Sequence, residues 1–297
     1  MAISTAATAG QAATAQRRPV RTDKGPRTPW WLYLCVFAVV VFCLVPFYWL
    51  LNISLKTGPQ LSSADIWPPD PSLDNYRSIF KNSSFTRALL NSAIVSLVTT
   101  AIGVMVGAFA AYALARLKMR GKGILLAVVL SITTFPQIAI AAPLFRLWSD
   151  FGLYNTLIGL VIPYLTFALP LSIYILVTFF RGIPRDLEEA ALVDGATNFQ
   201  AFFKVVVPLA APGLATTAIL TFIQAWNEFL LATTLTSSVT ARTVPVAISQ
   251  FTGSSEFEVP LGTQSAASVV ISIPLIVLVL LFQKRIVAGL TSGAVKG

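Results

Sequence analysis

The chain has 297 residues, of which 56% are hydrophobic and only 11% are charged, and its mean hydropathy is +0.76. A single soluble core cannot bury that much apolar surface, so the composition excludes an ordinary soluble domain. The chain contains no histidine, which removes the usual general base and the commonest metal ligand, and we expect no metal site.

Six long uncharged runs dominate the sequence. Each exceeds the roughly 20 residues that an α-helix needs to cross the hydrocarbon core of a bilayer. Because lipid offers backbone amides no water, runs of this length are expected to be helices. They lie between Arg27 and Lys56, Arg87 and Arg116, Lys122 and Arg146, Asp150 and Arg181, Lys204 and Glu228, and Glu258 and Lys284. The sequence therefore predicts an all-α polytopic membrane protein with six transmembrane helices in residues 30–285.

The basic residues are distributed unevenly between the predicted loops. Most of the 21 Lys and Arg residues fall on one side if the N-terminus is cytoplasmic, and basic residues favour cytoplasmic loops. We therefore predict that both termini are cytoplasmic, with residues 1–29 a disordered basic tail and residues 286–297 a short C-terminal tail. The net charge of +9 then reflects topology, and we expect no nucleic-acid partner.

The first two predicted spans, residues 30–51 and 88–114, are joined by a proline-rich loop that could hold a short interfacial helix in residues 73–85. The second span carries small residues at four-residue intervals, a spacing that lets membrane helices approach closely. These residues are Gly103, Gly107, Ala111 and Ala115. The pattern leaves open whether this face packs against another subunit or against a helix of the same chain.

The third and fourth predicted spans, residues 122–144 and 157–180, each contain two prolines. Each proline leaves a carbonyl group without its helical donor, and neighbouring groups must satisfy that carbonyl inside a membrane. The prolines are Pro136, Pro143, Pro163 and Pro170. We therefore expect kinks in both helices.

The fifth predicted span, residues 209–231, ends with Trp226, Asn227 and Glu228. A carboxylate inside a span is costly unless it faces protein or a wet cavity. Glu228 is therefore a candidate pathway residue, and the alternative is that it lies near enough to the outer surface to be solvated. Trp226 and Asn227 beside it are further candidates for the pathway, because an amide can form hydrogen bonds and an indole can stack on a ligand. The sixth predicted span is residues 266–281.

The loop at about residues 182–208, between the fourth and fifth spans, has strong local signals. Pro184 and the acidic residues after it favour a helix start, and Gly195 can end that helix in a left-handed cap. Thr197 and Gln200 then have the spacing of a capping box, which predicts a second short helix. Two such amphipathic helices can fill a groove on a cytoplasmic partner or lie on lipid as a linker.

The same loop contains a specific motif. Glu189, Ala190 and Ala191 are followed by three residues, Gly195, nine residues and Val205-Val206-Val207-Pro208. This spacing resembles the signature of permease subunits in bacterial ATP-binding-cassette (ABC) importers. Residues 75–76, 110–116, 227–229 and 287–297 also look like maltose-type sugar permeases. Residues 247–257 and the ending are most similar to the second permease of mycobacterial trehalose importers.

The resemblance implies a type I ABC importer permease fold in a bacterial inner (plasma) membrane. It implies that this chain forms half of a heterodimeric pathway with a second permease and imports a disaccharide, with trehalose favoured. It implies coupling to two ATPase subunits through the loop, where the residues concerned are Glu188, Glu189, Ala190, Ala191, Asp194, Gly195 and Ala196. An extracytoplasmic binding protein would deliver the sugar and contact a different loop, the outer one between the fifth and sixth spans, at Gly253, Ser254 and Ser255.

This chain should not hydrolyse ATP. Lys122 follows Gly121, but Gly123 replaces the Ser or Thr that would bind magnesium in a P-loop. We therefore expect no cofactor here, with ATP and Mg²⁺ bound by the partner ATPases. The main alternative is a secondary transporter driven by an ion gradient, but only Glu228 is ionisable within a span and no repeat relates the two halves. An intramembrane hydrolase lacks a histidine base and an evident Ser-Lys pair.

Overall fold

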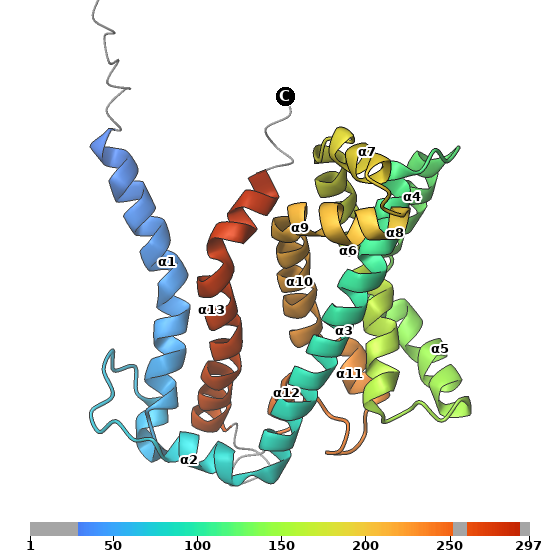
Figure 1. The fold of residues 1–297 in the computed structure, drawn as a ribbon. Coiled ribbons are helices and arrows are strands. Elements are labelled where there is room, and N and C mark those ends of the chain that lie inside the picture. Colours follow the sequence, from blue (N-terminus) through green and yellow to red (C-terminus); the bar gives the residue numbers. More distant parts are fainter. Residues whose placement is uncertain (1–28, 252–259, 292–297) are drawn as a thin grey trace, which may run out of the picture. The chain divides into compact units, whose positions relative to one another are not determined.

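The computed structural model describes residues 29–251 and 260–291, with side chains described to residue 283. It divides into two units, residues 1–46 and 47–297. The described residues are helical or lie in short connections (Figure 1). The elements are α1 (Trp30–Ser54), η1 (Gly58–Ser62), α2 (Asp74–Lys81), α3 (Ser83–Arg116), α4 (Lys122–Ser131), η2 (Ile132–Thr134), α5 (Gln137–Asp150), α6 (Leu157–Gly182), α7 (Asp186–Val193), α8 (Asn198–Ala201), η3 (Phe202–Val206), α9 (Val207–Leu209), α10 (Ala211–Trp226), α11 (Leu230–Leu235), α12 (Val244–Ser249) and α13 (Leu261–Thr291).

Among the described residues, α1, α3, α6 and α13 are each long and apolar enough to cross a membrane. Two further pairs pass the same test when each pair is taken together. The first joins residues 122–134 to α5 with a bend of 88°, and the second joins residues 198–209 to α10 with a bend of 77°. The structure thus has six candidate spans if each bent pair counts as one. A short helix, α2, is also present within residues 73–85, as the sequence predicts.

The third span is broken at Pro136, one of the prolines at which the sequence predicts a kink in a single helix over residues 122–144. The break falls at Phe135 and Pro136, between η2 and α5. A residue before proline is pushed towards extended backbone, and Phe135 has φ −73° and ψ 128°. The fifth span also differs, because α10 ends at Trp226 and α11 begins only at Leu230. At the other end of the chain, α13 continues to Thr291, beyond the predicted start of the tail.

Pro163 lies inside α6 and shows how a freed carbonyl is satisfied. Proline has no N–H, so the carbonyl four residues earlier, that of Gly159, loses its helical donor. The indole Nε1 of Trp148, from α5, donates to this carbonyl at 2.7 Å. A neighbouring helix therefore closes the gap, as the sequence led us to expect.

The small residues of α3 pack within the chain. Gly103 and Gly107 are buried, and a Cβ at Gly107 would lie 3.0 Å from Cβ of Ser172 in α6. The hydroxyls of Ser172 and Thr221 then join α6 to α10 at 3.1 Å. α3, α6 and α10 lie side by side around these residues (Figure 1). Of the two alternatives left open by the sequence, packing against helices of the same chain is thus the one observed.

We expect Gly107→Leu to force α3 and α6 apart, because the new side chain has no space beside Ser172. Overpacking of this kind costs about 1–3 kcal/mol or more. Thermal unfolding and size-exclusion profiles of the detergent-solubilised protein would measure the effect. Gly123→Leu is the matched control, because a Cβ there meets nothing within 4 Å. Equal stability of the two variants would contradict this description of the α3–α6 contact.

Candidate functional site

The loop between α6 and α10 begins with the helix α7. The sequence predicts a helix start at Pro184, and the structure begins α7 two residues later, at Asp186. The amide groups of Glu188 and Glu189 donate to the carbonyl of Arg185, at 2.9 and 3.0 Å. Three acidic residues occupy the first turn, where they interact favourably with the helix dipole.

The end of α7 has the local structure that the sequence predicts. Gly195 has φ +88°, the left-handed region that favours glycine. Its amide donates to Leu192 at 3.1 Å, and the amide of Ala196 donates to Ala191 at 2.9 Å. This pair of bonds defines a Schellman motif. Because a Cβ at Gly195 would meet nothing within 4 Å, backbone conformation rather than space accounts for the glycine.

The second short helix begins with the predicted capping box. The amide of Gln200 donates to the Thr197 hydroxyl at 3.2 Å, and the amide of Thr197 donates to the Gln200 side chain at 2.9 Å. The next segment, η3, is π-helical and lies between α8 and α9. Phe202 and Val206 are buried, and the ring of Phe202 packs on Tyr112 of α3 at 4.8 Å. The loop is therefore attached to the helical bundle along this segment.

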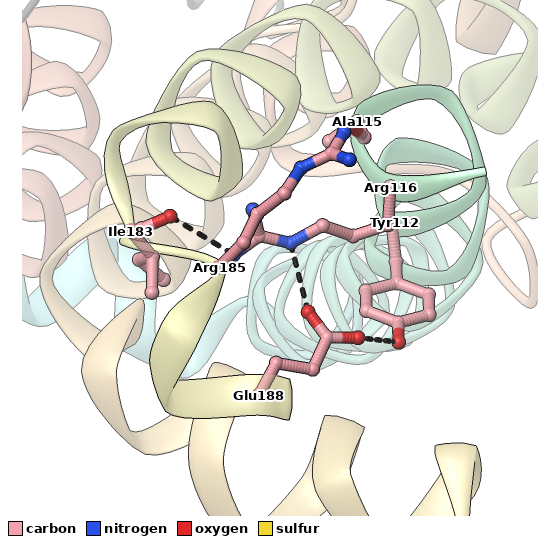
Figure 2. A network of polar contacts seen from close by, with 6 residues as sticks. All are labelled: Tyr112, Ala115, Arg116, Ile183, Arg185 and Glu188. Atoms are coloured by element: carbon pink, nitrogen blue, oxygen red, sulfur yellow. Dashed lines mark hydrogen bonds and ion pairs between the residues drawn. The ribbon is translucent and has the colours of Figure 1, made fainter. Parts of the chain in front are cut away.

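Glu188 turns inward and anchors α7 to the end of α3 (Figure 2). Its Oε2 lies 3.0 Å from Nε of Arg116, and the two side chains are only 12% and 7% exposed. Its other oxygen accepts a hydrogen bond from the Tyr112 hydroxyl. Arg116 also donates from Nη2 to the carbonyl of Ile183 at 3.1 Å, just after α6. One buried carboxylate and one guanidinium thus join α3, α6 and α7.

The other predicted coupling residues lie differently from Glu188. Glu189, Ala190, Asp194 and Gly195 are exposed, while Ala191 and Ala196 are half-buried. Both glutamates line a shallow cavity of about 140 Å³, together with Arg116, Arg185 and Leu192. α7 therefore has an anchored side at Glu188 and a free side at Glu189.

The three predicted pathway residues occupy different environments. Trp226 is 4% exposed and donates from Nε1 to the carbonyl of Ile271 in α13 at 3.2 Å. Asn227, just after α10, is exposed and its side chain donates to the carbonyl of Ile223 in that helix at 2.9 Å. Glu228 is partly buried, and its two oxygens accept from the amides of Leu231 and Ala232 at 2.7 and 3.0 Å. Glu228 thus caps the start of α11. The sequence offers two other roles for it, a pathway residue or a carboxylate solvated near the outer surface, and neither includes capping.

Two cavities lie beside the breaks in the third and fifth spans. The larger, of about 490 Å³, is lined by Leu130, Thr133, Phe135, Gln137, Phe167, Leu171, Leu220, Ile223 and Gln224. The smaller shares Gln137, Phe167 and Gln224 and also reaches Tyr164, Ala168, Ala225, Glu228 and Leu231. Of the predicted pathway residues, only Glu228 lines either cavity. Gln137 and Gln224 are not among the predicted pathway residues, although a carboxamide in an apolar span is a detectable signal.

The remaining predicted contacts, Gly253, Ser254 and Ser255, lie outside the described residues. The roles predicted for the pathway, coupling and binding-protein contact residues therefore stay predictions.

The fold and the loop together define a class of membrane transport protein. Residues 103–292 match the family described as the binding-protein-dependent transport system inner membrane component. The chain is 54% identical to the trehalose transport system permease SugB of Mycobacterium tuberculosis, over 91% of this chain and 98% of that protein. It is 41% identical to the sulfoquinovosyl glycerol transport system permease SmoH of Agrobacterium fabrum, over 89% and 93%. Its fold matches a chain of a bacterial alginate ABC importer with a TM-score of 0.70 and 25% identity, over 85% and 93%.

The chain belongs to this family of inner-membrane components. It is an all-α, multi-pass permease subunit of an ABC importer in the inner (plasma) membrane, and it is a transporter component rather than an enzyme. The resemblance to ABC sugar permeases drawn from the loop motif is therefore confirmed.

We expect Glu188→Leu and Arg116→Leu each to destabilise the protein by about 3–5 kcal/mol, because each leaves a buried charge without its partner. The double variant should lose less than the sum of the two, which a double-mutant cycle on thermal unfolding would measure. Glu189→Leu is the matched control, since its exposed side chain should matter by less than about 0.5 kcal/mol. If Glu188→Leu and Glu189→Leu unfold alike, the anchoring role of Glu188 is wrong.

Proposed function

We propose that this chain forms half of a heterodimeric pathway that imports a disaccharide, and that the disaccharide is trehalose. A second permease completes the pathway, an extracytoplasmic binding protein delivers the sugar, and two ATPase subunits that bind ATP and Mg²⁺ supply the energy. Both termini face the cytoplasm. The observation that carries the proposal is α7, a short helix anchored on one side by Glu188 and free on the other.

The free side of α7 suits docking into a groove on another protein. Its apolar residues Leu187 and Val193 are exposed, Val193 by 87%, and Phe199 of α8 is exposed nearby. Short amphipathic helices bind protein grooves through apolar residues of this kind. Glu189 adds a negative charge on the free side. We infer that this surface binds the ATPase subunit.

The anchored side explains how docking would act on the membrane helices. A helix held only by flexible loops could move without displacing its neighbours. α7 is instead joined to α3 and to the end of α6 through Arg116, and the aromatic ring of Phe202 secures the following segment. Movement of the docked ATPase would therefore be passed to these two spans.

The choice of trehalose is supported by the relative at 54% identity, whose name assigns trehalose transport to that protein. The family description supports a binding-protein-dependent process. We expect vesicles that contain this chain, its second permease, the ATPase and the binding protein to take up radiolabelled trehalose only when ATP is present. Uptake driven by a proton or sodium gradient without ATP would contradict the mechanism. Uptake of maltose but not trehalose would contradict the substrate alone.

We expect Glu189→Lys to leave membrane insertion intact but to weaken ATPase binding, because it reverses the charge on the free side of α7. Co-purification of the ATPase with the permeases and ATP-dependent uptake would both fall several-fold. Asp150→Lys is the matched control, a charge reversal at an exposed residue at the end of α5. A Glu189→Lys transporter with normal assembly and normal uptake would exclude Glu189 from the docking surface.

A further inference from the structure

We propose that the cavity of about 490 Å³ between the third, fourth and fifth spans is a binding site for an uncharged saccharide, with Gln137 and Gln224 as its polar contacts. This inference rests on the proposed function and assigns part of the sugar pathway to this subunit. The site would hold the sugar during its passage rather than select it first, which is the role of the binding protein.

The shape of the cavity fits a small ligand. Small-molecule sites usually enclose about 300–1,000 Å³, with mainly apolar walls and a few placed polar groups. Here Leu130, Leu171, Leu220 and Ile223 supply the apolar wall. The cavity also lies at the break between η2 and α5, to which Thr133, Phe135 and Gln137 belong. In secondary transporters, substrate sites are typically formed at broken spans of this kind.

The two glutamines have unused hydrogen-bonding capacity. Within the described residues, neither the Gln137 nor the Gln224 side chain makes a hydrogen bond to the protein. A polar group inside a span is costly unless it faces protein or a wet cavity. Both carboxamides line the same cavity from different helices, α5 and α10. Their common function there is to bind something that passes through it.

The chemistry of the lining indicates which class of ligand fits. A carboxamide donates and accepts hydrogen bonds, as a sugar hydroxyl does, and Thr133 adds a hydroxyl. The rings of Phe135 and Phe167 offer apolar faces for the C–H side of a sugar ring. The described lining contains no Lys, Arg, Asp or Glu, so nothing would neutralise a charged substrate. The site therefore fits a neutral sugar.

The smaller cavity extends this site towards Glu228 without making it acidic. It shares Gln137, Phe167 and Gln224 with the larger cavity, so the two lie next to each other. Both oxygens of Glu228 are already bonded to the amides that begin α11. The carboxylate is thereby held by the protein, and the glutamines remain the groups available to the sugar.

The test uses the full transporter with Gln137→Leu and Gln224→Leu, which keep the approximate volume of each side chain but remove the hydrogen bonds. Gln264→Leu in α13 is the matched control, because that glutamine lines neither cavity. Two measurements are made: ATP-dependent trehalose uptake at saturating loaded binding protein, and equilibrium dialysis of radiolabelled trehalose with the permease–ATPase complex. Co-purification of the ATPase reports assembly.

We expect each cavity variant to assemble normally, to raise the dissociation constant of the complex for trehalose roughly fivefold to tenfold, and to lower uptake by a similar factor. The control should match the wild type. Cavity variants that bind and transport like the wild type would overturn the inference while leaving the proposed function intact. If the wild type imports only another neutral disaccharide, the proposed substrate is wrong, and the same variants measured with that sugar decide the inference separately.

Discussion

Hydrocarbon offers no partner to a peptide group, so every break in a spanning helix must be closed by the protein itself. α6 meets this constraint with a side chain from α5, because Trp148 donates to the carbonyl that Pro163 frees. The fifth span meets it with a carboxylate, because Glu228 accepts from two amides at the start of α11. Trp148 and Glu228 thus satisfy groups that lipid cannot, and the two cavities lie beside the breaks that precede α5 and follow α10. Polar side chains, which are costly where they face lipid, can line these cavities instead.

At the end of the bundle that carries α7, a buried ion pair has the corresponding role. Burying Arg116 and Glu188 is costly, and their mutual attraction offsets that cost only because further bonds complete their surroundings. Tyr112 and the carbonyl of Ile183 supply those bonds. The ion pair adds little net stability, but it selects one placement of α7, since other placements would leave two buried charges unpaired. It therefore fixes one orientation of the helix, with Glu189 outward.

Much of this structure could be predicted from local patterns, and the rest depends on contacts between distant residues. The lengths of the apolar runs predict six spans, and Gly195, Thr197 and Gln200 predict the turns of the loop, because caps are formed by neighbouring residues. The sequence alone could not show which of Glu188 and Glu189 faces inward, since that depends on Arg116. Nor could it show that Glu228 caps a new helix, because the break after Trp226 has no proline to mark it. Gln137 and Gln224 are far apart in sequence, and only the fold brings them to one cavity.

α6 connects the two functional regions of the described structure. Phe167 and Leu171 in its middle line the larger cavity, while the carbonyl just beyond its end accepts from Arg116, which holds Glu188. The hydrogen bond from Ser172 of α6 to Thr221 of α10 is located on α6 after the cavity residues and before the end that Arg116 contacts. Because a packed helix moves largely as a unit, a displacement of α7 that shifts the end of α6 also shifts the wall of the cavity. The same helix that the ion pair anchors therefore sets the shape of the space offered to a sugar.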